Sequence, residues 1–561
     1  MVKLNSRKLG DFLLLANGLV LLLLINLIAS TNFYRVDLTE EARFSIKPAT
    51  RQMLQELDDK VYVEVFLEGE LNASFRRLQK SIKEILEEFK VYSEAKVEFI
   101  FTDPNMAASP KARSEFMQEI ARKGITPTNV VDPKNGQVTE KIIFPGALIS
   151  YGGFEVGVTL LKGNKANTAE EKINQSIEGL EYEFANVIFN LTSTDRKRIG
   201  FVTGHGELDS LQIASFNNTL LESYDVFKVD FQRNKAIENY DALILAKPTT
   251  PFSEIDKYKL DQYIMQGGKV LFLMDKLDAT MDSASLENYV AFPYSLNLDD
   301  LLFKYGVRLN MDLVQDRNAG LYPIVTGNLG GKPQLQLMDW PFFPLINRYA
   351  DHPITRNLDA VVTKFISSID TVKAEGVKKT PLMFTSQYSR KISAPVQVNI
   401  NDVRNNVKAE EFSVSMIPVG YLLEGNFTSV FKNRFLPNEI EVSKFKEKST
   451  STKIIVIADG DLARNDINPR NNQPQQLGYD QFTRYTFANQ ELLMNAVAYL
   501  VNENGLITAR NREVKIRPLD KERILAERLK WQLVNIALPI ILVVLYGVIR
   551  STLRRRKFSM F

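Results

Sequence analysis

The chain has 561 residues, of which 45% are apolar and 24% charged, values ordinary for folded protein and sufficient for about two to four domains. Subtracting the eight basic residues at the two ends from the total charge of +3 leaves −5 for residues 11–549, so a nucleic-acid role has no support. There is no cysteine, which excludes disulfides, cysteine nucleophiles and thiolate metal sites.

Two apolar segments lie at the chain ends, at residues 12–29 and 533–549, and each has its basic residues on the terminal side. Each covers about 25–27 Å as a helix, enough to cross a bilayer core. The positive-inside rule places the tails, residues 1–11 and 550–561, in the cytoplasm. We therefore expect a two-span protein of the bacterial inner membrane with a periplasmic bulk. A cleaved signal peptide is the alternative for the first segment.

Small and polar residues interrupt both apolar segments. Small residues let helices approach closely, and asparagine can hydrogen-bond between helices in lipid. If the spans pack on helices of another membrane protein, we expect the contact positions to be Asn17, Gly18, Asn26, Asn535 and Gly547.

A small α/β domain is predicted at residues 61–165, after a connector at 30–60 that contains a short helix. Residues 61–67 alternate as a strand, apolar residues from Leu78 to Phe89 mark one helix face, and residues 97–101 form a second strand. This pattern is typical of a βαβ unit with parallel strands. A helix at 114–123 and a hairpin at 142–161 complete a thioredoxin-like outline, without the Cys-x-x-Cys that thioredoxin chemistry needs.

A larger α/β domain is predicted at residues 195–505, after a bridging helix at 166–194. Its buried strands are separated by helical patterns, which indicates an open parallel sheet with helices on both faces. These strands are RIGFVTG at 198–204, DALILAK at 241–247, KVLFLMD at 269–275 and KIIVIADGD at 453–461. We assign no strand order to residues 297–434. A helix at 489–501 packs on the sheet, and a charged stalk at 506–532 leads into the second span.

The carboxyl ends of these strands carry the candidate site, because ligands bind there in doubly wound sheets. They hold Gly204-His205-Gly206-Glu207, then Asp275, then Asp459-Gly460-Asp461. We expect His205 to be partly exposed. Three interpretations stay open: turn and cap residues, which we favour, a ligand or cation site, and acid–base groups. We interpret His352 as a loop residue with a local hydrogen bond.

Known nucleotide and hydrolase motifs are absent from the sequence. Residues 327–333 lack the glycine spacing and the serine or threonine of a phosphate-binding loop. No G-x-S-x-G, H-E-x-x-H or calcium-loop pattern occurs either. We expect no cofactor and no bound metal.

Four segments together resemble a known family: Arg35-Val36-Asp37-Leu38-Thr39 with Phe44-Ser45, Thr203 to Glu207, Ala458 to Asp461, and Glu491 to Ala496. With the two-span layout, they look like auxiliary subunits of uncharacterised ABC transporters, of the gliding-motility GldG type of Bacteroidota. The resemblance implies a multi-span permease partner, a cytoplasmic ATPase reached through it, and a central domain similar to class I glutamine amidotransferases and to an intraflagellar-transport domain. Amidotransferases use a cysteine nucleophile, so that activity is not carried over.

Three functions compete. The first, which we favour, is a non-catalytic accessory subunit that couples the permease and ATPase to an envelope component. The second is a periplasmic receptor for a glycan, lipid or peptide, with His205 and Glu207 at its site. The third is a hydrolase using His205 with a carboxylate. Only two tryptophans, Trp340 and Trp531, are present, which weakens the glycan version because sugar sites often use aromatic platforms.

Overall fold

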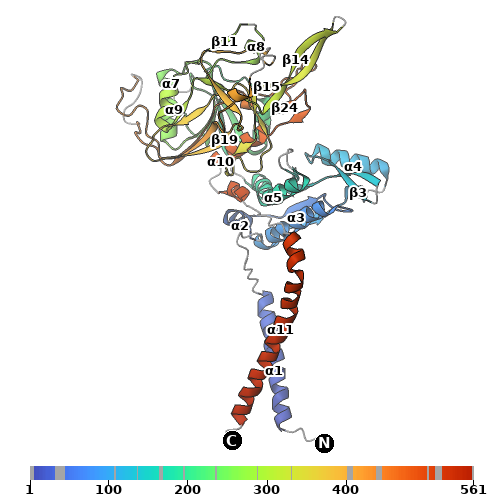
Figure 1. Cartoon of the computed structure of the whole chain (residues 1–561). Coiled ribbons are helices and arrows are strands. Elements are labelled where there is room, and N and C mark those ends of the chain that lie inside the picture. Colours follow the sequence, from blue (N-terminus) through green and yellow to red (C-terminus); the bar gives the residue numbers. More distant parts are fainter. Residues whose placement is uncertain are drawn as a thin grey trace. The chain divides into compact units, whose positions relative to one another are not determined.

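The structure is a computed structural model that divides into two compact units, residues 1–512 and 513–561 (Figure 1). It describes residues 6–31, 45–106, 109–134, 137–162, 168–193, 196–233, 237–286, 288–329, 332–400, 403, 408–437, 445–501, 505–511 and 521–558. The expected motif at residues 35–44 lies outside these ranges.

Two long helices are found near the chain ends, α1 (Ser6–Thr31) and α11 (Lys521–Phe558). Among the described residues, one segment is long and apolar enough to cross a membrane, Glu527–Leu553 within α11, while α1 carries a shorter apolar stretch, Phe12–Leu27. The helix α11 continues through Pro539, so residues 521–532 of the expected stalk and the second span lie in one helix. The two-span layout stays a prediction.

The smaller sheet has the strand order β2-β1-β5-β6. The strands β1 (Val61–Val65) and β2 (Val97–Phe101) are parallel and flank α3 (Ala73–Tyr92), so the predicted βαβ unit is confirmed. The strands β5 (Gly146–Tyr151) and β6 (Phe154–Thr159) form the predicted hairpin. The apolar face of α3 is buried in the core of this sheet.

Further helices and one hairpin surround this sheet. They are α2 (Pro48–Gln55), α4 (Pro110–Arg122), the hairpin of β3 (Thr128–Lys134) and β4 (Gln137–Ile143), and α5 (Ala169–Thr192). The start of α4 precedes the predicted one because Ser109 accepts a hydrogen bond from Ala112 N and Pro110 occupies the first turn. Thr168 and Glu171 form a capping box that starts α5.

The larger sheet has the order β16-β19-β22-β23-β10-β9-β7-β8. Its parallel strands are β7 (Arg198–Thr203), β8 (Asp225–Asp230), β9 (Ala242–Ala246), β10 (Lys269–Leu273) and β23 (Thr452–Ile457), which confirms the four predicted strands. The prediction of a purely parallel sheet is wrong at one edge. There β22 (Pro418–Gly425), β19 (Val377–Phe384) and β16 (Arg348–Tyr349) continue the sheet antiparallel, since the segment left unordered supplies three more strands.

Helices cover both faces of this sheet, as predicted. Leu271 of β10 packs on the face of α6 (Ala214–Ser223) and α10 (Asn489–Val501). Its neighbours Val270 and Phe272 pack on the opposite face with α7 (Glu254–Met265) and α9 (Asp299–Tyr305). Alternate strand residues therefore enter two cores.

The remaining elements lie mainly between β10 and β23 in the chain, and most of them are short. They are α8 (Met281–Ala284), β11 (Val290–Ala291) with β21 (Val396–Gln397), β12 (Val307–Leu309) with β18 (Ile369–Thr371), β13 (Asp312–Asp316) with β20 (Ser389–Ser393), β14 (Ala319–Leu329) with β15 (Lys332–Ile346) and β17 (Val361–Val362), β24 (Tyr479–Asp480) with β25 (Tyr485–Thr486), and the 3₁₀ segments η1 (Pro104–Met106), η3 (Ala409–Glu411), η5 (Gly460–Ala463) and η6 (Leu506–Asn511).

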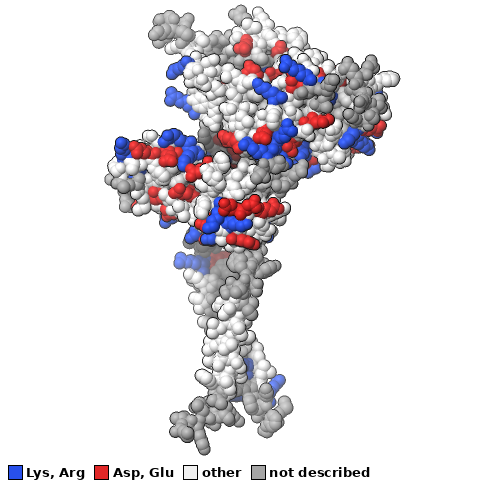
Figure 2. Space-filling view, turned by 180° about the vertical axis from the view of Figure 1, so that it is seen from behind, with Lys and Arg blue, Asp and Glu red and all other residues white. Residues whose placement is uncertain are grey.

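Charged residues of both signs are interspersed over the α/β surface seen in Figure 2. On this face no large area of one sign stands out, which agrees with the small net charge of the region. A mixed surface gives little long-range attraction for a polyanion.

Candidate functional site

The Gly204–Glu207 loop follows β7 and is held by bonds within the chain. Gly204 and Gly206 have φ angles of +116° and +71°, which favour glycine. The carbonyl of His205 accepts hydrogen bonds from the amides of Thr249 and Thr250, both at 2.9 Å. The amide of His205 donates to a Glu207 carboxylate oxygen at 2.7 Å. These φ angles and hydrogen bonds therefore fix the backbone of the loop in its turn conformation.

His205 is only 1% exposed, so the expectation of a partly exposed side chain is wrong. Its ring stacks on Phe252 with centroids 3.6 Å apart, because the chain between β9 and α7 folds over it. Its Nε2 lies 3.3 Å from an Asp256 oxygen in the first turn of α7, and its Nδ1 lies 3.4 Å from a Glu207 oxygen. This geometry supports the turn interpretation over a solvent-facing receptor or hydrolase site.

The second histidine, His352, lies in a loop as expected. Its Nδ1 accepts a hydrogen bond from Ile354 N at 3.3 Å, and its carbonyl accepts one from Thr355 N at 3.0 Å. Burial lowers the pKa of His352 to about 4. The ring therefore stays neutral at physiological pH and acts as a local acceptor.

The other strand-end carboxylates gather around Lys247, a residue that was not among the predicted site residues. The Lys247 ammonium lies 2.8 Å from an Asp275 oxygen and 2.5 Å from an Asp461 oxygen. Asp459 accepts from the amides of Lys364 and Asp461, at 3.0 and 2.8 Å. The signal in the sequence was a lysine directly after a fully apolar strand, one residue nearer its strand than Asp275 and Asp459 are to β10 and β23.

These groups are buried, and their charges compensate each other. Burial opposes the charged form of Lys247, but Asp275 and Asp461 raise its pKa above the ordinary value. Burial raises the pKa of Asp275 to about 6 despite the nearby ammonium. Burial also raises the pKa of Asp459 well above its usual range, with Asp275 and Asp461 adding to the effect. Against burial, Lys247 and Arg464 lower the pKa of Asp461.

Lys247 occupies the place that a cation would take among these carboxylates. Within the described residues, no cluster of three or more histidine, aspartate or glutamate side chains is suited to a metal ion. Gly460 permits the close packing, because a β-carbon there would lie 2.8 Å from Lys247 Cγ and 3.1 Å from Asp275 Cγ. The cluster works as an internal ion network that joins the ends of β9, β10 and β23.

A pocket of about 300 Å³ opens beside Asp459 and Asp461. Aromatic side chains, among them Tyr322 and Phe482, line it together with Arg464. Two ring centroids, those of Tyr322 and Phe482, are 5.8 Å apart. The strand-end edge therefore offers a small cavity with mixed aromatic and charged walls.

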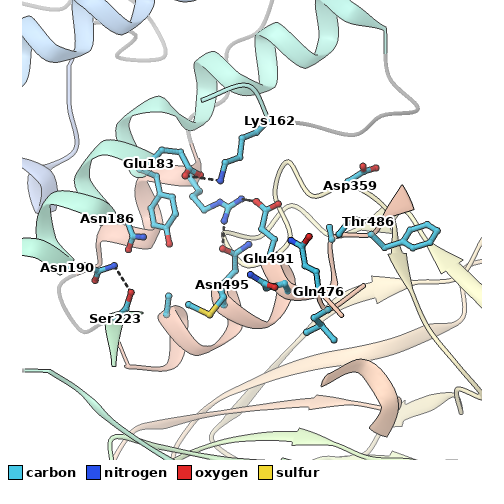
Figure 3. A pocket seen from close by; sticks show the side chains of 18 of the residues that line it. Lys162, Glu183, Asn186, Asn190, Ser223, Asp359, Gln476, Thr486, Glu491 and Asn495 are labelled. Carbon is cyan, nitrogen blue, oxygen red and sulfur yellow. Dashed lines mark hydrogen bonds and ion pairs between the residues drawn. The ribbon is translucent and has the colours of Figure 1, made fainter. Parts of the chain in front are cut away.

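A second pocket, of about 450 Å³, lies between α5 and α10 (Figure 3). Its charged residues are paired within the chain: Lys162 with Glu183 at 3.0 Å, and Arg510 with Glu491 at 3.1 Å. Asn190 donates to Ser223 at 3.0 Å. The sequence does not reveal this pocket, because its walls come from α5, α10, η6 and the β24–β25 region, which only the fold brings together.

The predicted permease-contact residues lie on α1 and α11. Asn17, Gly18, Asn26, Asn535 and Gly547 are all exposed within the chain. Nothing within 4 Å would meet a β-carbon added at Gly18 or Gly547. Both helices therefore have room for another molecule at these positions.

Comparisons with known proteins identify relatives. The family described as "ABC-type uncharacterized transport system" matches residues 196–496, and a domain of unknown function matches residues 40–150. The chain is 22% identical to an uncharacterized protein of Borreliella burgdorferi, over 98% of this chain and 99% of that protein. A solved structure, the mmIFT52 N-terminal domain, is similar over 55% of this chain and 98% of its own, with 13% identity and a TM-score of 0.31.

Proposed function

The chain belongs to the auxiliary family of ABC-type transport systems, and we propose that it is a non-catalytic, membrane-anchored subunit coupling a permease and its ATPase to an envelope component. The family match over residues 196–496 carries this proposal. The apolar part of α11 supports it, since the chain itself buries none of that segment and another partner or lipid must cover it.

A non-catalytic role is supported by the state of the strand-end residues. His205 is buried and stacked, and the carboxylates of Asp275 and Asp461 face an internal ammonium. Acid–base or nucleophilic catalysis needs a group that can reach a substrate. In this proposal, ATP hydrolysis takes place on the partner ATPase.

We extend the proposal to topology and cell type: both termini cytoplasmic, the α/β region periplasmic, and a transporter of the gliding-motility type. Reporter fusions at each terminus test the topology, because a cytoplasmic reporter should be active at both ends. Protease added outside the inner membrane should remove most of residues 35–525. A periplasmic C-terminus refutes the two-span arrangement.

Purification in mild detergent tests the partnership. We expect the permease and ATPase to co-purify in stoichiometric yield. Gly18→Leu combined with Asn26→Leu should reduce their recovery, since a bulky apolar face prevents close helix contact. Both positions are exposed in the chain, so its own packing should be unaffected. Leu27→Val, an exposed position about 180° around the same helix from Gly18, serves as the matched control.

A small-molecule receptor is the second candidate, and the two pockets favour it. Their volumes, about 300 and 450 Å³, fall in or at the edge of the range of ligand sites. Such a receptor would use these pockets in place of the buried His205 and Glu207. A small molecule retained by the purified protein, in the absence of permease and ATPase, would favour this candidate over the coupling subunit.

A further inference from the structure

We propose that two adjacent residues of α5, Glu181 and Tyr182, form a common anchor for the segments that connect the two membrane helices to the α/β region. The proposal rests on the proposed function of a membrane-anchored coupling subunit. With this anchor, a displacement of either membrane helix would be passed first to α5. Glu181, Tyr182 and Arg510 are its positioning residues.

Glu181 holds the segment that comes from α1. The side chain is completely buried, and its Oε1 accepts hydrogen bonds from Lys47 N at 2.6 Å and from Thr50 Oγ1 at 2.8 Å. Lys47 is the N-cap residue of α2 and makes no capping bond with its own side chain. A carboxylate is favourable at a helix N-terminus, where the free amides and the helix dipole are positive. Glu181 thus caps α2 from a distant part of the chain.

Tyr182 holds the segment that leads to α11. The guanidinium carbon of Arg510, in η6, lies 5.1 Å from the centre of the Tyr182 ring. The same guanidinium donates to Glu491 and to the carbonyl of Arg356, both at 3.1 Å, and to Asn495. Figure 3 shows the bonds that reach Glu491 and Asn495 on α10. One side chain therefore ties η6 to α5 and to α10.

Apolar contacts also hold both segments, the one from α1 and the one that leads to α11, beside α5. Ile46, just before α2, is 2% exposed, and Leu506, at the start of η6, is fully buried. Both belong to the same core as Leu180 and Phe184, which flank the anchor on α5. Ile507 and Ala509 pack in a further cluster with Tyr182 and Ala498. The described ends of both connections, at Ile46 and at residues 506–509, are therefore inserted into the protein core beside the anchor.

The position of the anchor explains how movement could reach the larger sheet. The helix α10 packs on that sheet, and the pocket of about 450 Å³ separates parts of α5 and α10 beside Arg510. The bonds of Glu181 and of Arg510 each resist separation of the segments that they join, because breaking them leaves a desolvated charge. Movement of either membrane helix is expected to shift α5 against α10.

Hydrogen exchange on the complete complex in lipid nanodiscs tests the anchor. The complex with permease and ATPase is compared with and without Mg-ATP and vanadate. In the wild type we expect nucleotide to change the exchange of α5 and α10. Glu181→Ala and Arg510→Met should each reduce this change at least twofold, while co-purification with the partners stays unchanged.

Matched variants distinguish the loss of the anchor contacts from a general destabilisation of the fold. Glu183→Gln changes a glutamate on the same helix that pairs with Lys162 on the pocket side, and it should keep the wild-type response. Glu181→Gln and Tyr182→Leu are milder changes for the case in which a stronger variant fails to fold, and each should still weaken the response. A full nucleotide response in folded Glu181 and Arg510 variants would overturn the anchor. A wild-type complex that does not assemble or respond would overturn the coupling function itself.

Discussion

Replacing His205 by alanine separates the structural interpretation of the strand-end loop from a functional one. The imidazole is 1% exposed and stacked on Phe252 at 3.6 Å, so its removal leaves a cavity between β7 and α7. Large-to-small changes in a core cost about 2–4 kcal/mol. The carboxylates of Glu207 and Asp256, nearly buried beside the ring, lose a partner, which adds about 1–3 kcal/mol. We expect a total loss on the order of 3–7 kcal/mol.

Thermal unfolding of the detergent-purified chain measures this loss. Trp340 is fully buried in the larger α/β region and reports its unfolding by fluorescence. For a region of this size the expected fall in Tm is on the order of 10 °C. His205→Phe keeps an aromatic ring against Phe252 and should recover part of the loss, since it restores volume without the polar contacts.

The opposite result would refute this reasoning. If His205→Ala melts like the wild type and assembles with the permease and ATPase, but the complex is inactive, the ring has a functional role. The receptor and hydrolase interpretations would then regain support. A small change in Tm together with full activity would show that the burial of the ring contributes little.

Three further predictions follow from the same region. Gly206→Ala should destabilise the protein by roughly 1–3 kcal/mol, because its β-carbon would lie 2.1 Å from Thr249 Oγ1. Gly152 also has a positive φ, but a β-carbon there would meet no atom within 4 Å, so Gly152→Ala should destabilise the protein less in the same melting assay. Lys247→Met should lower the free energy of unfolding by about 3–5 kcal/mol, because it leaves buried carboxylates unpaired. Adding Asp275→Asn should restore part of this loss. Strictly additive losses would contradict the ion network. The pKa of His352 is lowered to about 4, so its ring stays neutral in the folded state, while the unfolded chain binds a proton below about pH 6.5. The stability of the protein should therefore fall as the pH is lowered from 6.5 to 4, and it should fall less in His352→Gln. Identical pH profiles of Tm for the two proteins would refute this.

Local patterns in the sequence were sufficient for most of the helices and the central strands. The bounds of α10 agree with the prediction, and the four apolar strands became β7, β9, β10 and β23, because burial on both faces requires a continuous apolar run. The segment between Asn297 and Arg434 could not be ordered. Many of its strands are short and pair across long stretches of chain, as β12 does with β18, so no local period reveals them. The longer strands β14 and β15 form a local hairpin.

The candidate site depended much more on the tertiary structure. The sequence placed Asp275, Asp459 and Asp461 at strand ends, and the fold brings them together as parallel strands require. It could not reveal that Lys247 neutralises them, since Lys247 and Asp461 are 214 residues apart. Nor could it reveal that Phe252 covers His205, because burial depends on which segment folds over a loop.

The sequence by itself determined the alternation of strands and helices, the apolar ends and the absence of cysteine chemistry, since periodicity, length and composition are local properties. Only the tertiary structure decided which charges are paired and which are exposed. Glu181 shows the physical reason. A glutamate on an amphipathic helix is expected at the surface, but Glu181 caps α2 from 131 residues away and is fully buried there. A charged side chain enters a core only where a partner compensates its desolvation, and that partner is chosen by the fold.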